Sequence, residues 1–377
     1  MRFDSTPYYH VGEMYSWDTL MEEMHQEVRL IDQGGFTGLW LAEHHFAWDG
    51  WYRASPNPIL LGAGLIKNSD HLRIGQCGTI LPDWHPLRVA EDIALLDNFT
   101  DGRVDFGVAR GFDTRASAQF NAVGDRRNPK LNSEFFNEAL DVIIDAWNQD
   151  AFQYRGRHYT FPEPGWREPN SWVRDPRYHA EDGEMIALGV HPKPVQKPHP
   201  PIFQMSTSNR SHELAGRRGI ATMCQTVSLG KIREIWNTYY DAARDARGEE
   251  NDFGDKLAVM IATYVADTME EAEKAVRPGA NMLGVWNKRD PVSASKDSFV
   301  DGEIEEGDLD LDWFDFQSKH DLIMVGTPDT VAEQIERYRM ELNCQHIALF
   351  LNFPGLSFRQ VMNSLTLFAE QVIPRFN

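Results

Sequence analysis

The sequence predicts a single (β/α)8 barrel, the TIM-barrel fold, covering residues 1–377. Short apolar runs bounded by turns alternate with amphipathic stretches along the whole chain, which is the pattern of strand–helix units around a parallel sheet. Eight such runs favour a closed barrel over an open sheet. They lie at residues 2–8, 38–46, 72–81, 104–110, 201–206, 221–226, 257–265 and 346–351.

The main alternative, an open doubly wound sheet, lacks its glycine fingerprint. Gly62 and Gly64 have no third glycine at the required spacing and lie inside a helical apolar stretch. We interpret them as a place of close helix packing. Length alone would allow two or three domains, but barrels of this kind often reach this length as one domain.

Capping residues mark several helix boundaries. Ser16 is expected to cap a helix that runs through residue 33. Pro86 suits the first position of another helix, and Ser208 or Asn209 caps a third one directly after a strand.

Two segments interrupt the barrel rhythm and are expected to be insertions. Residues 161–200 are rich in Pro, Trp and His, whereas residues 278–319 are acidic, with aromatic residues between the acids. Loops this long are usually lids, binding loops or disordered segments. The acidic segment is either a solvated linker or an active-site lid.

Composition excludes several classes of function. A formal net charge of -20, without a cluster of Lys and Arg, disfavours nucleic acid and membrane surfaces as partners. No apolar run approaches the roughly 20 residues that span a bilayer, and the N-terminus lacks signal-peptide features, so we expect a cytoplasmic protein. Three widely spaced cysteines predict neither disulfides nor a zinc site.

The active site of such a barrel lies at the C-terminal ends of its strands. The second strand ends in Glu43, His44 and His45, whose side chains should alternate, with His44 on the opposite side from the other two. No metal site is therefore predicted, because the three cannot converge and no HExxH-like spacing occurs. His44 could serve catalysis or simply hydrogen-bond the backbone.

Arg110, at the end of the fourth strand, could bind a phosphate or form a structural ion pair. The hydroxyls of Ser206, Thr207 and Ser208 could cap the helix that follows, and such a helix start also suits a phosphate. A Walker loop and a GxSxG elbow are both absent, so triphosphate hydrolysis and serine hydrolysis are disfavoured.

Several motifs together resemble the bacterial luciferase-like flavin-dependent monooxygenases, over essentially the whole chain. The order and spacing of the motifs carry the resemblance. They are LWLAEHHF at 39–46, ILP at 80–82, HP at 85–86, EDIALLD at 91–97, GR at 102–103, FGVARG at 106–111, PKPVQKP at 192–198 and VGTPD at 325–329.

The resemblance implies that reduced FMN is bound as a co-substrate and reacts with dioxygen to a 4a-hydroperoxide, which oxygenates a small organic molecule. His44 matches the family's catalytic histidine. Cys77 and Gly78 match a strand-end peptide that is cis in many members and bulges against the flavin ring. Ala109 stands where luciferase has a reactive cysteine near the flavin.

The same resemblance implies a site for the flavin phosphate. Arg110 and Ser206 match phosphate ligands, Met205 and Thr207 offer backbone groups, and Asn209 offers a side chain. Lys130 falls where luciferase has an arginine, which keeps the charge but loses the planar fork.

His45 and Glu91 match residues that pair across the luciferase subunit interface, which implies a homodimer or a heterodimer with a related subunit. A separate flavin reductase would supply reduced FMN, the acidic segment would be the lid, and an aldehyde or ketone would be the natural substrate. An apolar wall beside the flavin could be formed by Tyr8, Tyr9, Phe46, Trp48, Trp51, Trp84 and Phe112.

Two alternatives stay open. A deazaflavin-dependent hydride transfer uses the same fold without oxygen, and a non-catalytic flavin-binding subunit would have kept the fold without turnover.

Overall fold

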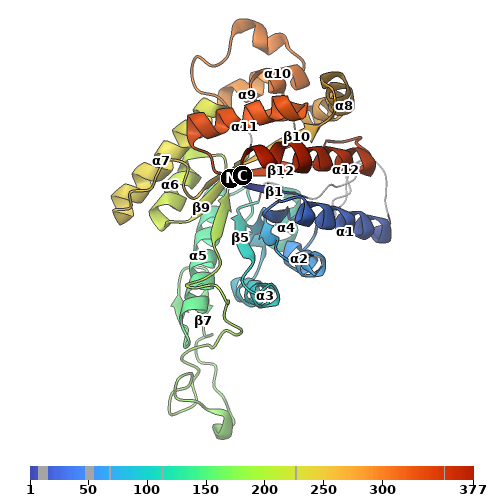
Figure 1. Cartoon of the computed structure of the whole chain (residues 1–377). Helices are drawn as coiled ribbons and strands as arrows, with labels where there is room; N and C mark the ends of the chain where they lie inside the picture. Colours follow the sequence, from blue (N-terminus) through green and yellow to red (C-terminus); the bar gives the residue numbers. More distant parts are fainter. Residues whose placement is uncertain are drawn as a thin grey trace.

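A computed structural model describes residues 1–6, 16–46, 55–67, 69–111, 114–225, 227–287, 289–351 and 353–377. Within them, eight parallel strands form a closed ring, in which the last strand pairs with the first (Figure 1). This confirms the predicted barrel. In ring order the strands are β1 (Arg2–Ser5), β2 (Gly38–Leu41), β3 (Arg73–Gln76), β5 (Val104–Ala109), β8 (Ile202–Met205), β9 (Ala221–Gln225), β10 (Leu257–Val265) and β12 (His346–Phe350).

Two short strands add to this ring. β4 (Thr79–Ile80) continues the line of β3 along β5, and β11 (Ile323–Gly326) pairs with the last four residues of β10. The sequence analysis did not predict β11, because four residues outside the repeating strand–helix rhythm give too short a pattern to recognise.

Helices surround the barrel and bury its outward-facing side chains (Figure 1). The α-helices are α1 (Trp17–Gln33), α2 (Pro58–Ile66), α3 (Pro86–Phe99), α4 (Thr114–Phe120), α5 (Pro129–Asn148), α6 (Asn209–Arg218), α7 (Leu229–Arg247), α8 (Met269–Asn287), α9 (Pro291–Asp297), α10 (Trp313–Lys319), α11 (Pro328–Leu342) and α12 (Phe358–Leu367). Short helical turns are η1 (Leu81–Asp83), η2 (Ser171–Val173), η3 (Glu306–Asp310), η4 (Phe368–Val372) and η5 (Ile373–Arg375).

The predicted caps are confirmed. Ser16 accepts from Thr19 N at the start of α1, α3 begins at Pro86, and Ser208 accepts from Ser211 N at the start of α6. None of the helices in the described ranges is long and apolar enough to cross a membrane.

The two glycines of α2 behave differently. A Cβ at Gly62 would lie 3.0 Å from Ile74 Cγ1, so this helix approaches the sheet closely, as predicted. A Cβ at Gly64 would meet nothing within 4 Å, so the packing interpretation is wrong for that position.

A buried ionic network occupies the N-terminal end of the barrel interior. Asp4 Oδ2 accepts from Trp40 Nε1 at 2.6 Å and lies 2.6 Å from His346 Nε2. Arg2 links Asp4 to Asp105, since its Nη2 lies 2.7 and 2.6 Å from these carboxylates. Burial opposes ionisation of Asp4, but the charges of His346 and Arg2 hold its pKa well below the ordinary value.

The last part of the insertion at residues 161–200 lies at this same N-terminal end. Lys193 Nζ donates to Ala146 O and Gln149 O at the C-terminal end of α5, and Gln196 Nε2 binds Asp97 and the carbonyl of Val104. A hairpin of β6 (Tyr154–Arg155) and β7 (Thr160–Phe161) precedes the segment. Phe161, where the segment begins, lies against His85 at the start of α3, with 5.5 Å between the ring centroids, so the insertion also reaches the side of the barrel on which β4 ends.

The acidic segment is folded, so the solvated-linker interpretation is wrong. Helix α8 continues through Pro278 to Asn287, beyond the predicted start of irregular chain. The part that follows has an apolar core of its own, and Glu303 accepts hydrogen bonds from Ser228 Oγ and Gly230 N at the start of α7. This contact places the segment beside the C-terminal end of β9.

We expect Asp4→Asn to destabilise the fold by roughly 3–5 kcal/mol, because it removes the buried carboxylate that both Arg2 and His346 contact and leaves Arg2 paired with Asp105 alone. Urea unfolding of the variant and the wild type measures the loss. Asp310→Asn, at an exposed position, is the matched control and should change stability by less than about 0.5 kcal/mol. A loss below about 1 kcal/mol for Asp4→Asn would contradict the role of the network.

Candidate active site

The predicted site residues lie at the C-terminal ends of four neighbouring strands. His44 follows β2, Cys77 follows β3, Arg110 follows β5, and Ser206 follows β8. Strand pairing brings these ends together in the same order, with Ile80 opposite Ala109 and Val108 opposite Gln204. The mouth of the barrel thus has one side that carries most of the predicted residues.

A bulge carries Cys77 and Gly78. The partner of Gly75 is Asp105 and that of Thr79 is Val108, so β3 and β4 contain one residue more than β5 between these pairs. The peptide bond between Cys77 and Gly78 is cis, as the resemblance implies. Burial raises the pKa of the Cys77 thiol to about 12, so this side chain stays protonated.

Glycines let the bulge approach its neighbours. A Cβ at Gly107 would lie 1.4 Å from the carbonyl oxygen of Gln76, and a Cβ at Gly78 would lie 2.9 Å from Val108 C. The side chain of Met205 reaches both glycines, since its Cγ would lie 3.1 Å from the Gly78 Cβ and its Cε 3.1 Å from the Gly107 Cβ. Beside the bulge, the barrel interior below the mouth is therefore lined by backbone atoms and by the flexible side chain of Met205.

His44 is half-buried, and its backbone N–H donates to Ser55 O at 2.9 Å. Trp40 belongs to the apolar cluster inside the barrel. Because side chains alternate along an extended chain, His44 falls on the same side as Trp40, toward the barrel axis.

Glu43 points the other way and is fully buried. Its Oε1 accepts from Trp84 Nε1 at 2.9 Å and contacts His45 Nε2 at 2.8 Å, and its Oε2 accepts from Ile80 N at 2.9 Å. The expected location of Glu43 and His45 on one side of the strand end is thus observed. His45 is engaged within its own chain, and Glu91 forms an ion pair with Arg88 at 3.0 Å.

The predicted aromatic wall is described only in part. Trp84 packs against the main core and donates to Glu43, so it serves the fold at this point. Phe46 is half-exposed and stacks on Phe120, with 5.7 Å between the ring centroids. The other predicted members lie outside the described residues; they are Tyr8, Tyr9, Trp48, Trp51 and Phe112.

Arg110 is held at the mouth by neutral groups. Its Nε donates to Asn132 Oδ1 at 3.0 Å and its Nη2 to Pro129 O at 2.7 Å, and no carboxylate of the described chain lies within 4.0 Å of it. Burial and the nearby Arg126 lower its pKa from the ordinary value. Arg110 therefore forms no structural ion pair with the described residues, and the guanidinium can accept an anion.

Sequence reasoning missed Asn132, which orients this arginine. It is fully buried on α5, and its Nδ2 donates to the carbonyls of Arg110 at 3.1 Å and Gly124 at 2.9 Å. An amide among the apolar core positions of an amphipathic helix was the signal that could have identified it.

The remaining predicted residues lie at two helix starts. Ser206 and Thr207 precede the cap of α6, and Ser206 Oγ accepts from Ser208 N at 3.2 Å. Lys130 is exposed in the first turn of α5. Asn209 is the exception, because its Nδ2 donates to Glu234 Oε1 at 2.5 Å, so its amide is already engaged.

Sequence reasoning also missed Asp83, in the turn after β4. Burial is the main cause that raises the pKa of Asp83 to about 6, and the charges of Glu43 and Asp125 add to it. The hydrogen bond from Ser117 Oγ at 2.9 Å and the charge of His45 act in the opposite direction. This carboxyl therefore titrates near neutral pH.

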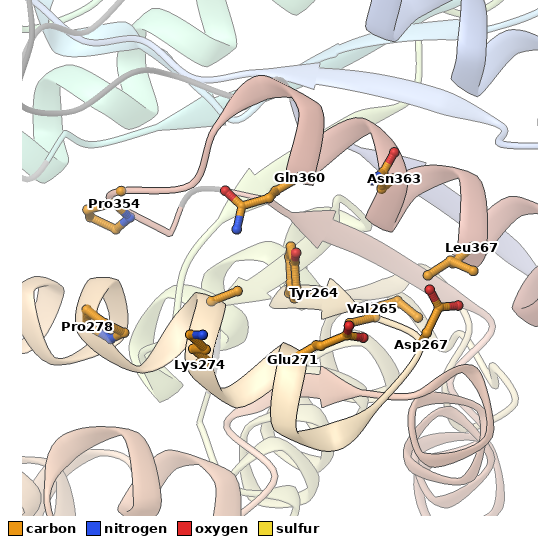
Figure 2. Close-up of a pocket in the computed structure, with 13 residues that line it drawn as sticks. Tyr264, Val265, Asp267, Glu271, Lys274, Pro278, Pro354, Gln360, Asn363 and Leu367 are labelled. Carbon is orange, nitrogen blue, oxygen red and sulfur yellow. The ribbon is translucent and has the colours of Figure 1, made fainter.

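A separate groove of about 560 Å³ lies between α8 and α12, at the ends of β10 and β12 (Figure 2). Tyr264 lies at its centre, and Lys274 and Gln360 face it from the two helices. No predicted site residue lines this groove. Across the described ranges, no three His, Cys, Asp or Glu side chains gather in a way that could hold a metal ion.

The raised pKa of Asp83 makes stability depend on pH. The folded state binds this proton more tightly than the unfolded chain, so the contribution of Asp83 is largest below about pH 4 and falls as the pH rises to about 6. We therefore expect the melting temperature of Asp83→Asn, relative to wild type, to rise between pH 4 and pH 7. A difference that stays constant over this range would refute the assignment, and exposed Asp310→Asn is the control.

Comparison with known proteins identifies the family. The family profile described as "Luciferase-like monooxygenase" matches residues 1–342. The oxygenase component of the flavin-dependent trigonelline monooxygenase of Acinetobacter baylyi is 23% identical over 374 residues, covering 97% of this chain and 93% of that protein.

Two solved structures share the fold over the whole chain, each at 22% identity. The monooxygenase RslO1 from Streptomyces bottropensis gives a TM-score of 0.77, with 100% of both chains covered. The oxygenating constituent of 3,6-diketocamphane monooxygenase from Pseudomonas putida, a type II Baeyer–Villiger enzyme in complex with FMN, gives 0.76, with 100% and 99% covered. The match to the family profile over most of the sequence shows that this chain belongs to the luciferase-like monooxygenase family of oxygenating enzymes.

Proposed function

We propose that this enzyme uses reduced FMN and dioxygen to transfer one oxygen atom to a small organic substrate. The observation that carries the proposal is Arg110, a half-buried cation at the barrel mouth with hydrogen-bond partners but no carboxylate of the described chain beside it. A phosphate would complete its environment.

The residues at the mouth fit FMN at both of its ends. Arg110, Lys130 and Ser206 would hold the phosphate, together with the backbone N–H groups of Thr207 and Asn209 at the start of α6. The ring would lie against the Cys77–Gly78 bulge, where glycines leave backbone surface that a planar ligand can approach. Ala109 adds little bulk beside it.

When bound, reduced FMN supplies the electrons that activate dioxygen. The chain contributes position, charge and proton transfer. Arg110, oriented by Asn132, neutralises the phosphate and fixes the cofactor in the mouth. His44, on the axial side of its strand end, would accept or donate a proton at a ring nitrogen.

The folded acidic segment would act as the lid. It is anchored beside the end of β9 through Glu303, which receives hydrogen bonds from Ser228 and Gly230. A cover over the mouth would keep water away from the activated oxygen.

We infer that the substrate is an aldehyde or ketone, since the two oxygenases with 3,6-diketocamphane and trigonelline in their names indicate that relatives take small carbonyl-bearing or polar molecules. A separate reductase would supply reduced FMN, in line with the words "oxygenase component" in the name of one relative. Dimerisation through His45 and Glu91 would require both to exchange their present partners, Glu43 and Arg88.

The central experiment mixes the enzyme with reduced FMN, isotopically heavy dioxygen and a panel of ketones and aldehydes. Incorporation of one heavy oxygen atom into a product supports the proposal. Oxygen-independent reduction of a substrate with a reduced deazaflavin would instead establish the hydride-transfer alternative. Flavin binding without any turnover would establish a non-catalytic flavin binder.

Arg110→Gln should weaken binding of reduced FMN by roughly tenfold to a hundredfold, as expected when a charged hydrogen bond is lost. Riboflavin lacks the phosphate, so its affinity should change little in the same variant. Anaerobic fluorescence titration measures both affinities, and Arg375→Gln, at the other end of the chain, is the control. Equal losses for FMN and riboflavin would rule out the phosphate role.

His44→Ala should lower turnover by roughly 10²- to 10⁴-fold, the range for a lost general acid or base. Its affinity for reduced FMN should stay within about threefold of wild type, because the phosphate contacts are intact. Single-turnover kinetics and anaerobic titration separate the two effects, with exposed His191→Ala as control. Unchanged turnover would remove His44 from the mechanism.

A further inference from the structure

The groove between α8 and α12 contains a nearly buried hydroxyl that no described part of the fold uses (Figure 2). Tyr264 is only 6% exposed, and its hydroxyl forms no hydrogen bond with any described residue. Buried polar groups are normally hydrogen-bonded, so a partner from outside the chain belongs here. Water would satisfy the hydroxyl alone, and the groups around it therefore decide which ligand fits.

Contacts at both ends of the groove fix its shape. Val265 N donates to Ser364 Oγ at 2.8 Å, which ties the end of β10 to α12. At the other end α8 lies against the loop after β12, where a Cβ on Gly279 would lie 2.2 Å from Pro354 O. The cavity of about 560 Å³ between these contacts is thus built into the fold, and its volume lies in the usual range for ligand pockets.

Three hydrogen-bond donors face the middle of the groove. Gln360 Oε1 accepts from Ser357 N at 2.9 Å, which leaves Nε2 for the groove, and Figure 2 shows this nitrogen on the side of Tyr264. Lys274 faces the groove from α8. Burial and the charge of Glu271 raise the pKa of Tyr264, so its hydroxyl stays protonated and can donate. An ammonium, an amide and a hydroxyl together suit a carboxylate.

Lys274 is not neutralised in the way that the next cation of α8 is. The guanidinium of Arg277 lies 2.6 Å from each of three carboxylates, those of Glu273, Asp312 and Asp315. Lys274 has no carboxylate within 4.0 Å among the described residues. A negatively charged group that enters the groove would therefore meet a cation without a competing partner.

Two carboxylates at one end decide what else the ligand must carry. Figure 2 shows Asp267 and Glu271 on the same side of Tyr264. Thr268 Oγ1 donates to Glu271 at 3.2 Å, whereas Asp267 has no partner within the described ranges. With one cation against two carboxylates, the groove disfavours a dianion such as phosphate and favours a ligand that also carries a positive charge.

We propose that this groove binds a free amino acid with an apolar side chain. At neutral pH such a molecule carries one carboxylate and one ammonium. The carboxylate accepts hydrogen bonds from Tyr264, Gln360 and Lys274. The ammonium faces Glu271 and Asp267, so both charges of the ligand meet groups of opposite sign.

Apolar residues of the groove suit the side chain of such a ligand. They are Val265, Leu367, Ala275, Pro278 and Pro354. Burial of an aliphatic side chain against them adds a hydrophobic contribution that a glycine ligand would lack. The groove lies beside β10 and β12, whereas Arg110 follows β5 on the other side of the ring, so this inference is independent of the flavin chemistry.

The first test is isothermal titration calorimetry of the full-length protein with leucine, for which we expect a Kd of about 1 mM or tighter. Leucinamide lacks the carboxylate and 4-methylpentanoate lacks the ammonium, so each should bind at least about tenfold more weakly. No binding of leucine, methionine or valine at about 10 mM would overturn the proposal. Binding of 4-methylpentanoate or inorganic phosphate as tight as that of leucine would overturn it too.

Tyr264→Phe tests the groove directly, because it removes a hydroxyl that the described fold does not use. Leucine should bind at least about tenfold more weakly to this variant, while the melting temperature stays unchanged. Lys274→Gln should weaken binding to a similar extent, and Lys296→Gln, an exposed position on α9, is the matched control without effect. Unchanged leucine affinity in Tyr264→Phe and Lys274→Gln would refute the site.

Two further measurements distinguish the groove from the barrel mouth. Arg110→Gln should leave the affinity for leucine unchanged, because this arginine lies at the mouth. Leucine should slow amide hydrogen exchange in the first turns of α8 and α12, which form the walls of the groove. Loss of leucine binding in Arg110→Gln, or protection confined to the ends of β2, β3, β5 and β8, would place leucine in the mouth and contradict the proposal.

Discussion

The buried carboxylate of Asp4 joins three neighbouring strands of the barrel. It receives Trp40 from β2, contacts His346 from β12 and binds Arg2 of its own strand, which extends the network to Asp105 on β5. Both neighbours of the first strand are thus tied to one charge at the closure point of the ring. Because the network occupies the N-terminal end, the opposite end is free to carry ligand-binding groups.

The barrel could be predicted because its strands and helices repeat a local sequence pattern. Parts of the site could not, because they depend on contacts between segments that are distant in the sequence. Eight strands follow from apolar periodicity, and His44 and Arg110 follow from their place at strand ends. The amide of Asn132 among apolar helix positions could have marked it as unusual, but its bonds to Arg110 and Gly124 across a loop could not be foreseen. The pKa of Asp83 depends likewise on burial and on carboxylates from other segments, which no spacing reveals.

The two insertions show the same limit. Composition marked both as departures from the barrel rhythm, but acidic composition also suggested a solvated linker, whereas Phe299 and Phe316 form a small core there. In the other insertion, aromatic composition gave no sign that Trp172 would be almost fully exposed. Which aromatic residues are buried depends on how each segment folds back on itself. Neither segment has a helical or strand periodicity in its sequence that would indicate which side chains are buried.

The neutral hydrogen-bond partners of Arg110 affect how an anion would bind and dissociate. A cation paired with a carboxylate would have to break that pair each time an anion arrived and restore it each time the anion left. Here the amide of Asn132 and the carbonyl of Pro129 hold the guanidinium in both situations. An anionic ligand could therefore bind and leave repeatedly without any change in these two hydrogen bonds.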